Sequence, residues 1–311
     1  MSDVVFEQAG FLSADGKTRV AAYFWTPAEG KPLAVLQLSH GMCEYIQRYD
    51  AWARRFVEAG FAVCGNDHLG HGSTAPDPDG LGYTAKRGGA DLLVEDLHQM
   101  TQLAKEKYPD VPVVLYGHSM GSFAARLYLA RYGEELSGAL ISGTAGPEAP
   151  TGIAVRLAHA IAAAKGAHHR SRLLTSLAFG SYNKRFGEEK DAQSWLTRDA
   201  EVRRRYAADP FCTFTFTAAG YDTLFSLLSA VSDKKWASCV PKSLPVLLFS
   251  GDMDPVGNYG KGVQRIYERL QAAGCRVRLR LYQNGRHEMH NELNRDEVFA
   301  DLVAYLKEIL V

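Results

Sequence analysis

The sequence lacks the features that direct a chain out of the cytoplasm or into a membrane. Residues 1–6 contain no basic stretch followed by an apolar core, and no run approaches the roughly 18 apolar residues of a membrane span. The five cysteines are odd in number and include no C-x-x-C pair, which argues against a disulfide framework and a zinc site. We therefore expect a cytoplasmic protein with no secretory leader and no membrane span.

The sequence also lacks an excess of charge of either sign. Lys plus Arg and Asp plus Glu both total 35, so the formal net charge is zero. No overall field attracts such a chain to nucleic acid, and we expect no nucleic-acid partner. Apolar residues, by contrast, make up 46% of the 311 residues, which is enough for the core of a large domain.

Strand and helix patterns alternate over the first 144 residues. Alternating apolar and polar residues on both sides of a turn at 14–17 indicate an antiparallel hairpin. Short, mostly apolar runs predict buried strands at 33–39, 61–64, 113–116 and 136–142. Helical spacing between them predicts helices at 46–59 and 90–107. This order indicates β-α-β units and a mostly parallel sheet.

The alternation stops at about residue 145 and resumes near residue 240. Between these points the pattern is helical or irregular, with helices expected at 153–164 and 223–230. Strands at 244–250 and 275–282, each followed by a helix, then complete the pattern. We therefore predict one α/β core formed by 1–144 and 241–311, with residues 145–240 inserted as a helical cap.

Ser119 is the candidate nucleophile. It lies in Gly117-His118-Ser119-Met120-Gly121, directly after a predicted buried strand and directly before a predicted helix. A serine on such a tight turn projects its hydroxyl from the end of the sheet, and side chains at Gly117 and Gly121 would collide with neighbouring backbone. The strand and helix context makes this G-x-S-x-G pattern a functional signal.

A serine nucleophile needs a base, and the base needs an acid that orients it. The turn after the strand at 244–250 contains Asp252 and Asp254; we favour Asp254, because Asp252 lies close enough to the strand end to cap its own turn. The turn after the strand at 275–282 contains His287 and His290. We favour His287, which directly follows a glycine turn, whereas His290 could begin the last helical region.

The tetrahedral intermediate of acyl transfer also needs hydrogen-bond donors for its oxyanion. The amide of Met120, directly after the serine, and that of Met42, after the strand at 33–39, are placed to supply them. His40, His68, His71 and His118 show no metal-ligand spacing, and no nucleotide-binding motif is present. We therefore expect neither a metal nor another cofactor.

Four motifs in order along the chain resemble the monoacylglycerol lipase and lysophospholipase-like branch of the α/β-hydrolase superfamily, grouped with serine aminopeptidase-like hydrolases. They are His40-Gly41-Met42-Cys43-Glu44 with Arg48-Tyr49, Asp67 to Gly72, Gly117 to Gly121, and Asp252 to Gly257. The resemblance spans about 30–145 and 240–300 and is weaker across the insertion.

The resemblance implies an α/β-hydrolase fold whose triad is Ser119, Asp254 and His287, with Met42 and Met120 as oxyanion donors. It further implies that His40, Gly41 and His118 lie at the substrate site and that the inserted segment covers an acyl pocket. Cys43 departs from the family, which commonly has glycine there, so we expect a changed loop geometry and a buried structural thiol.

The leading interpretation is a serine hydrolase that cleaves a lipid-like carboxylic monoester, such as a monoacylglycerol or a lysophospholipid. An aminopeptidase is the enzymatic alternative and would use acidic residues of the insertion, Glu188, Glu189 and Asp191, to hold an amine. A non-catalytic ligand-binding protein is the third. The basic run Arg203-Arg204-Arg205 is most simply a solvated helix face, and its alternative interpretation is a site that favours anionic head groups. The insertion is expected to contact membrane surfaces only transiently, and the oligomeric state is not predicted.

Overall fold

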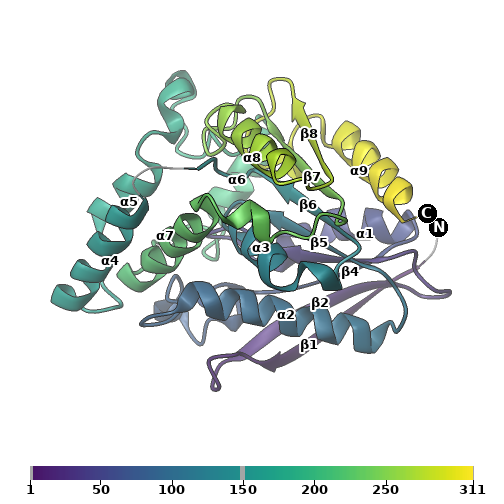
Figure 1. Cartoon of the computed structure of the whole chain (residues 1–311). Helices are drawn as coiled ribbons and strands as arrows, with labels where there is room; N and C mark the ends of the chain where they lie inside the picture. The colour runs from purple at the N-terminus through teal and green to yellow at the C-terminus, as the bar shows by residue number, and fades with distance from the viewer. Residues whose placement is uncertain (1–2, 148–150, 311) are drawn as a thin grey trace.

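The computed structural model of the chain describes residues 3–147 and 151–310. Met1, Ser2 and Val311, within the predicted core, and residues 148–150, within the predicted cap, lie outside the described residues. The described strands form one sheet in the order β1-β2-β4-β3-β5-β6-β7-β8 (Figure 1). The strands are β1 (Val4–Leu12), β2 (Arg19–Pro27), β3 (Val35–Ser39), β4 (Ala62–Asn66), β5 (Val113–His118), β6 (Gly138–Ser142), β7 (Val246–Gly251) and β8 (Val277–Tyr282).

The sheet is antiparallel at one edge and parallel elsewhere. β1 pairs with β2, and β2 with β4, in antiparallel register, whereas every pairing from β4 to β8 is parallel. The carboxyl ends of β3, β5, β7 and β8 therefore lie at the same edge of the sheet. The predicted hairpin and the mostly parallel α/β-hydrolase sheet are confirmed.

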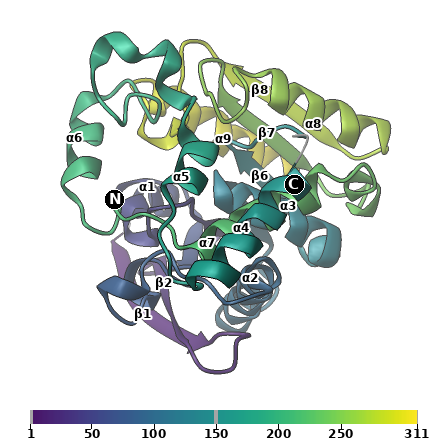
Figure 2. The same cartoon turned by 90° about the vertical axis from the view of Figure 1, so that its left-hand side faces the viewer.

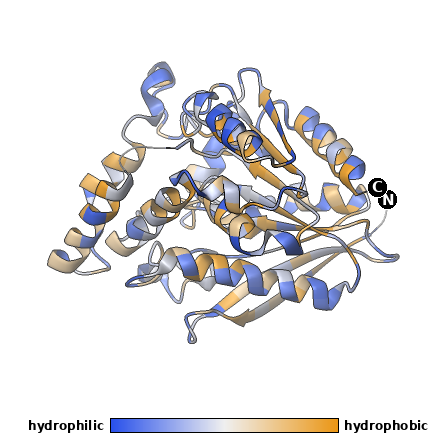
Figure 3. Ribbon diagram, viewed as in Figure 1, coloured by the Kyte–Doolittle hydropathy of each residue, from blue (hydrophilic) through white to orange (hydrophobic). Residues whose placement is uncertain are grey.

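Helices cover both faces of the sheet, and this explains the apolar strands. The helices of the core are α1 (Asp50–Glu58), α2 (Gly89–Lys107), α3 (Met120–Tyr132), α8 (Lys261–Ala272) and α9 (Arg295–Ile309). In β5, Val113 and Leu115 belong to an apolar cluster that includes side chains of α2, α3 and α8, whereas Val114 and Tyr116 belong to a second cluster that includes side chains of α1 and α9. Burial on both faces requires an apolar side chain at almost every position, and the strands are accordingly largely orange in Figure 3.

The inserted segment contains four α-helices among its described residues. They are α4 (Thr151–Lys165), α5 (Arg172–Phe179), α6 (Ala200–Ala208) and α7 (Ala218–Ser232). α7 packs on α2 and α3, and α4 packs on the outer side of α7. Figure 2, in which this side faces the viewer, shows α4, α5 and α6 in front of the sheet. The chain thus has a helical insertion above the carboxyl ends of the strands.

The insertion also presents apolar side chains to solvent. Ala158 is the single buried residue of α4, and Ile153 on the same helix is 62% exposed. None of the described helices, however, combines the length and the hydropathy that crossing a bilayer requires.

Candidate active site

Ser119 lies on the turn between β5 and α3 in a strained backbone conformation. Its φ is 53° and its ψ is −123°, a combination that non-glycine residues rarely adopt and that functional sites concentrate. A side chain at Gly117 would place a Cβ 2.6 Å from the Cβ of Ala125, and one at Gly121 would collide with the backbone of Ser39. The steric reason expected for these two glycines is therefore confirmed.

The structure brings Asp254 and His287 together beside this turn. Asp254 follows β7 and His287 follows β8, and both side chains are buried. The Nδ1 of His287 donates to the Oδ1 of Asp254 across 3.0 Å. The same carboxylate accepts from the amide of Val256 and the hydroxyl of Ser250, both at 2.9 Å. Asp254 is thus held in place and fixes the tautomer of His287 that leaves Nε2 as the acceptor.

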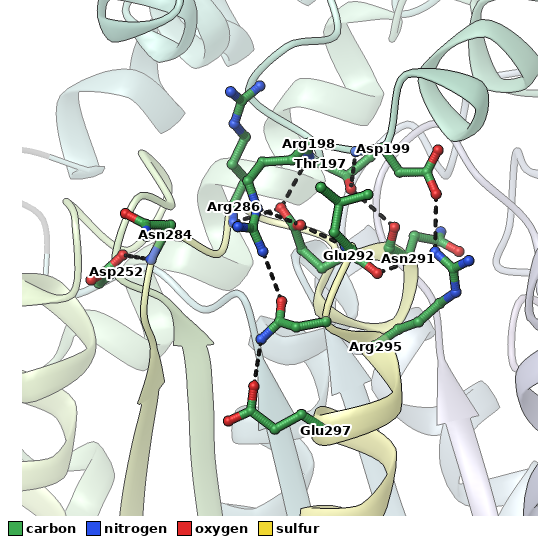
Figure 4. Close-up of polar contacts among 12 residues, drawn as sticks. Thr197, Arg198, Asp199, Asp252, Asn284, Arg286, Asn291, Glu292, Arg295 and Glu297 are labelled. Carbon is green, nitrogen blue, oxygen red and sulfur yellow. Dashed lines mark hydrogen bonds and ion pairs between the residues drawn. The ribbon is translucent and has the colours of Figure 1, made fainter.

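The alternative acid and base do not join this pair. Asp252 was expected to cap its own turn, but its Oδ1 accepts from the amide of Asn284 at 2.7 Å and therefore caps the neighbouring turn (Figure 4). His290 is buried, and its ring stacks on Tyr49 with the centroids 4.5 Å apart. Neither nitrogen of His290 has a hydrogen-bond partner among the described residues.

The surroundings of these histidines shift their pKa values in opposite directions. Burial disfavours the imidazolium of His287, but the Asp254 carboxylate outweighs burial and raises the pKa of His287 above its ordinary 6.5. Burial lowers the pKa of His290 to about 4 and that of His118 well below the usual range. His287 is therefore the histidine at this site whose surroundings favour accepting a proton near neutral pH.

A cavity of about 300 Å³ opens beside these residues. Ser119, His118, His287 and Met42 line its inner end. The remaining wall comes mainly from the insertion and mixes apolar with uncharged polar side chains: Phe179, Trp195, Leu196, Phe214, Thr175, Asn183, Gln193, Thr213 and Thr215. The carboxylates of Glu44 and Glu288 also line the cavity, and both are paired with Arg48. Such a lining suits a ligand that is partly apolar and neutral.

The loop after β3 lies against the serine turn. A side chain at Gly41 would place its Cβ 2.9 Å from the Cβ of Ser119, so only glycine allows this approach. His40 donates through Nδ1 to the carbonyl of Gly41 at 2.8 Å and accepts through Nε2 from the amide of His68 at 2.9 Å. Among the predicted substrate-site residues, His118 thus lines the cavity, whereas His40 and Gly41 support its wall from behind.

The two predicted oxyanion donors have free amides. In residues 3–147 and 151–310, neither the amide of Met42 nor that of Met120 donates a hydrogen bond. Met42 follows Gly41, whose backbone lies against Ser119, and Met120 directly follows Ser119. The amides are thus available to an oxygen bound at Ser119.

A buried ionic network joins the Met42 loop to the His287 loop. Glu44 accepts from the amide of Gly41 and from the Nη1 of Arg48, the latter at 2.8 Å. Arg48 also forms two hydrogen bonds of 3.0 Å with Glu288. Burial raises the pKa of Glu44, and Glu288 raises it further, whereas Arg48 opposes both effects. For Glu288, Arg48 outweighs burial and lowers the pKa.

Cys43 has the backbone conformation that explains the glycine common at its position. Its φ is 54°, in the left-handed region that glycine adopts without strain. Its thiol donates to the carbonyl of Phe214 at 3.3 Å, and its carbonyl accepts from the hydroxyl of Tyr206 at 3.0 Å. Burial raises the pKa of this thiol, so it remains protonated. The expected structural role of a buried thiol fits these contacts.

Several residues of the site were missed from the sequence. Gly143, with φ 56°, leaves room for the ring of His287, because a Cβ there would lie 2.9 Å from its Cε1. Ser250 supports Asp254, and Trp195 packs with its ring centroid 5.0 Å from that of His287. Gly143 and Ser250 lie at the carboxyl ends of strands, and this position in the sequence could have identified them as site residues. Trp195, in an irregular part of the insertion, offered none.

The histidines after β3 and β4 pack together without forming a metal site. The rings of His40 and His68 are 4.2 Å apart, and those of His40 and His71 are 5.1 Å apart. His68 hydrogen-bonds Ser39 through Nε2, and His71 bonds the carbonyl of Leu69 through Nδ1. Over the part of the chain that the structure describes, no group of three or more His, Cys, Asp or Glu side chains could hold a metal ion.

Known proteins share both the sequence pattern and the fold. The sequence profile of the family named serine aminopeptidase, S33, matches residues 30–294. A monoacylglycerol lipase of Mycolicibacterium smegmatis is 30% identical over 94% of this chain and 94% of its own length. A monoglyceride lipase of Rattus norvegicus is 28% identical over 91% of this chain and 84% of its own length.

A solved structure is similar over nearly the whole chain. A thermostable carboxyl esterase from Bacillus coagulans, crystallised with glycerol, superposes with a TM-score of 0.92 at 32% sequence identity. The superposition covers 99% of this chain and 100% of that one. The likeness therefore includes the insertion as well as the core.

Proposed function

The chain belongs to the serine aminopeptidase S33 family of α/β-hydrolases, and we propose that it is a serine hydrolase that cleaves carboxylic monoesters of monoacylglycerol type. Its relatives include esterases and lipases. The observation that carries the proposal is the buried His287–Asp254 pair at the inner end of a cavity that Ser119 also lines. In the proposed triad, Ser119 is the nucleophile, His287 the base and Asp254 the orienting acid.

The proposed reaction begins with a proton transfer to His287. The Nε2 of His287 accepts the hydroxyl proton as the Oγ of Ser119 attacks the ester carbonyl, and Asp254 stabilises the imidazolium that forms. His287 then returns the proton to the departing alcohol, which leaves an acyl-enzyme. Water attacks this acyl group with His287 again as base, so that the acid is released and the serine restored.

The amides of Met42 and Met120 are proposed to hold the oxyanion. The residue before each donor is held by its own amide: that of Gly41 donates to Glu44, and that of Ser119 donates to the carbonyl of Ser142 at 3.1 Å. Donors fixed in this way before the reaction stabilise an oxyanion most effectively. Loss of one such donor typically costs about 2.7–4 kcal/mol of transition-state stabilisation. The network of Glu44 and Arg48 supports the loop of Met42 and therefore contributes indirectly.

The contacts of the insertion favour a neutral ester over an amine substrate. Glu189 pairs with Arg286 and Arg203, and Asp191 pairs with Arg203 at 2.6 Å. Neither of these acids nor Glu188 lines the cavity, and the two carboxylates that do, Glu44 and Glu288, are both paired with Arg48. The cavity therefore does not offer the free negative charge that an aminopeptidase would direct at a substrate amine. The ester interpretation is therefore preferred to the peptidase one.

The same contacts argue against the basic run as a site for anionic head groups. Arg203 is largely buried and bonds Asp191 and the carbonyl of Thr197. Arg204 and Arg205 pair with Glu201 on their own helix. Because the guanidinium groups already have partners, we expect a neutral glycerol head group to be preferred to a phosphate.

We propose that residues 145–240 act as the cap over this site. Thr175, Trp195 and Phe214, all from this segment, line the cavity. Leu173 and Leu177 of α5 are 58% and 53% exposed, which suits transient contact with a lipid surface.

Replacing both leucines by Gln is expected to weaken sedimentation with lipid vesicles while hydrolysis of a short water-soluble ester is retained. Unchanged sedimentation would contradict contact through these two side chains.

We also propose a cytoplasmic location, from the cysteines. All five are free thiols, and four of them are buried. A reducing compartment preserves such a set. Cell fractionation is expected to recover the esterase activity with the cytosol, and recovery with washed membranes would contradict the proposal.

A substrate panel tests the proposed activity. It comprises p-nitrophenyl esters of increasing acyl length, monoacylglycerol, lysophosphatidylcholine and an aminoacyl anilide, each with wild type and Ser119→Ala. The proposal expects turnover of the p-nitrophenyl esters and monoacylglycerol by wild type, slower turnover of the lysophospholipid, and none by the variant. A preference for the anilide would overturn the ester assignment, and a Ser119→Ala variant as active as wild type would overturn the mechanism.

A further inference from the structure

A strip of the inserted segment, residues 194–199, lies along the loop that carries His287 (Figure 4). The indole of Trp195 packs beside the imidazole of His287. Directly after the histidine, the amide of Glu288 donates to the carbonyl of Leu196 at 2.7 Å. The insertion therefore contacts both the ring and the following backbone of the proposed base, although the two segments are about ninety residues apart in the chain.

Glu292 joins this strip to the backbone on the other side of the histidine. Its carboxylate is fully buried. Oε1 accepts from the amide of Arg286, directly before His287, and from the amide of Arg198 in the strip, both at 3.0 Å. Oε2 accepts from the Nε of Arg198 and from the amide of Leu293, both at 2.8 Å. One carboxylate thus receives four donors from the two segments (Figure 4).

The amides on both sides of His287 are therefore committed to fixed partners. Arg286 bonds Glu292, and Glu288 bonds the strip, so the backbone that sets the direction of the imidazole has little freedom. A base must be held within about 0.5 Å of its productive position, and a misplacement of about 1 Å can cost on the order of 100-fold in rate. Small changes in this loop are thus expected to appear in the chemical step.

We propose that Glu292 is a positioning residue that holds His287 in place by fastening residues 194–199 to its loop. The inference rests on the proposed function, because it concerns the base of that reaction. It adds that the insertion contributes to the chemistry as well as to the cavity: the strip must remain docked for His287 to be aligned. Substrate access is then left to α5, whose Thr175 and Phe179 line the cavity.

The structure provides a matched control for this role. Arg295 and Asp199 form a second ion pair between the same two segments, at 2.9 Å, but their side chains are 44% and 17% exposed. In the pair of Arg198 and Glu292, the carboxylate is fully buried, and its loss leaves donors without an acceptor. Neither Arg295 nor Asp199 bonds a residue adjacent to His287, and Arg295 bonds the backbone carbonyl of Glu292, at 3.2 Å, rather than its carboxylate.

The experiment compares Glu292→Gln and Arg198→Met with Arg295→Gln. For a p-nitrophenyl ester, the first two variants are expected to lower kcat at least about tenfold, with KM changed by less than about threefold, because transition-state alignment rather than binding is lost. The downfield proton resonance of the His287–Asp254 hydrogen bond is expected to broaden or disappear in both. Arg295→Gln is expected to keep the kcat and the resonance of wild type.

A purely structural role of Glu292 would give a different result. Glu292→Gln would then unfold at a lower temperature, while the kcat and the resonance of the folded protein stayed within about twofold of wild type, and this would overturn the inference. If Glu292→Gln does not fold, Arg198→Met decides by the same two measurements. If wild type itself turns over no ester, the proposed function fails, and the resonance alone still decides whether Glu292 positions His287.

Discussion

Asp254 concentrates three hydrogen bonds on one carboxylate, from Val256, Ser250 and His287. An amide in its place would offer an N–H group where a donor already points, and His287 would turn to the wrong tautomer. Asp254→Asn is therefore expected to lower kcat by about 10⁴-fold, the order of loss known for such a change in a triad. Steady-state kinetics with a p-nitrophenyl ester measures it, and thermal unfolding checks that the fold is intact.

Asp252 supplies the comparison for this prediction. Its carboxylate bonds the amide of Asn284 at the exposed end of β8 and takes no part in the pair at the cavity. Asp252→Asn should therefore keep nearly the full rate. A large loss in Asp252→Asn together with an active Asp254→Asn would reverse the assignment of the acid.

His287 sets the expected pH dependence. Because Asp254 raises its pKa above 6.5, His287 binds a proton as the pH falls through that raised value, and the protonated ring cannot act as a base. The rate is then lost on the acid side, with an apparent pKa above 6.5. A profile of kcat/KM against pH measures this limb; a rate that stays flat from pH 8 to pH 5 would contradict a role for His287 as base.

Among the elements, the loop after β3 depends on Glu44. Glu44→Gln keeps one acceptor for the amide of Gly41 but removes the negative charge opposite Arg48. It also places an N–H group among N–H donors that the carboxylate accepts from, so some of these donors lose their acceptor. We expect kcat to fall at least about tenfold, since a misplaced oxyanion donor costs up to 10²–10³-fold. The exposed pair of Asp50 and Arg54 on α1 is the control: Arg54→Gln should leave kcat unchanged. Equal rates in both variants would contradict a role for the loop.

The elements differ in how far the sequence predicts them. The strands β3, β5 and β7 are short apolar runs buried on both faces, and their predicted and observed bounds agree within a few residues. The helices α5 and α6 are only 8 and 9 residues long, and the sequence showed no clear period there. For α7, predicted to begin at 223, the hydroxyl of Thr217 caps an earlier start at Ala218.

The residues of the site also differ in how far the sequence predicts them. Ser119, Asp254 and His287 each follow a strand, so parallel topology alone predicts that they meet, and their assignment as a triad stays a prediction for the experiments above. The network from Glu44 through Arg48 to Glu288 spans some 240 residues of sequence. A single sequence has no local signal for such a contact, because its partners are chosen by the packing of two distant loops.

At the scale of the whole molecule, buried neutral histidines make stability depend on pH. Burial lowers the pKa of His68 to about 3, and those of His71 and His290 to about 4. Below pH 6.5 these imidazole rings bind protons in the unfolded chain but not in the folded chain, so the free energy of unfolding falls as the pH falls. Each unit of difference contributes about 1.4 kcal/mol per group at most. The carboxyls of Glu44, Asp67 and Asp96 act in the opposite sense, because burial raises their pKa values to about 7, 6 and 6 and the folded chain binds protons there first. We expect the histidines to prevail, because the pKa values of five buried histidines are lowered.

Urea unfolding at a series of pH values measures this decline, which is expected between about pH 6.5 and 4. His290→Phe should flatten it, because His290 has no hydrogen-bond partner among the described residues and stacks on Tyr49, a contact that Phe retains. A stability that is constant over this range in wild type would show that the buried histidines do not control acid unfolding.

The sheet unites these features, because β3, β5, β7 and β8 carry the proposed oxyanion loop, nucleophile, acid and base at one edge. The central claim is that the chemistry starts at Ser119. Labelling the protein with a fluorophosphonate and mapping the adduct by mass spectrometry tests it most directly. We expect a single adduct on Ser119 that is absent from Ser119→Ala; an unlabelled wild type, or an adduct on another residue, would show that Ser119 is not the nucleophile.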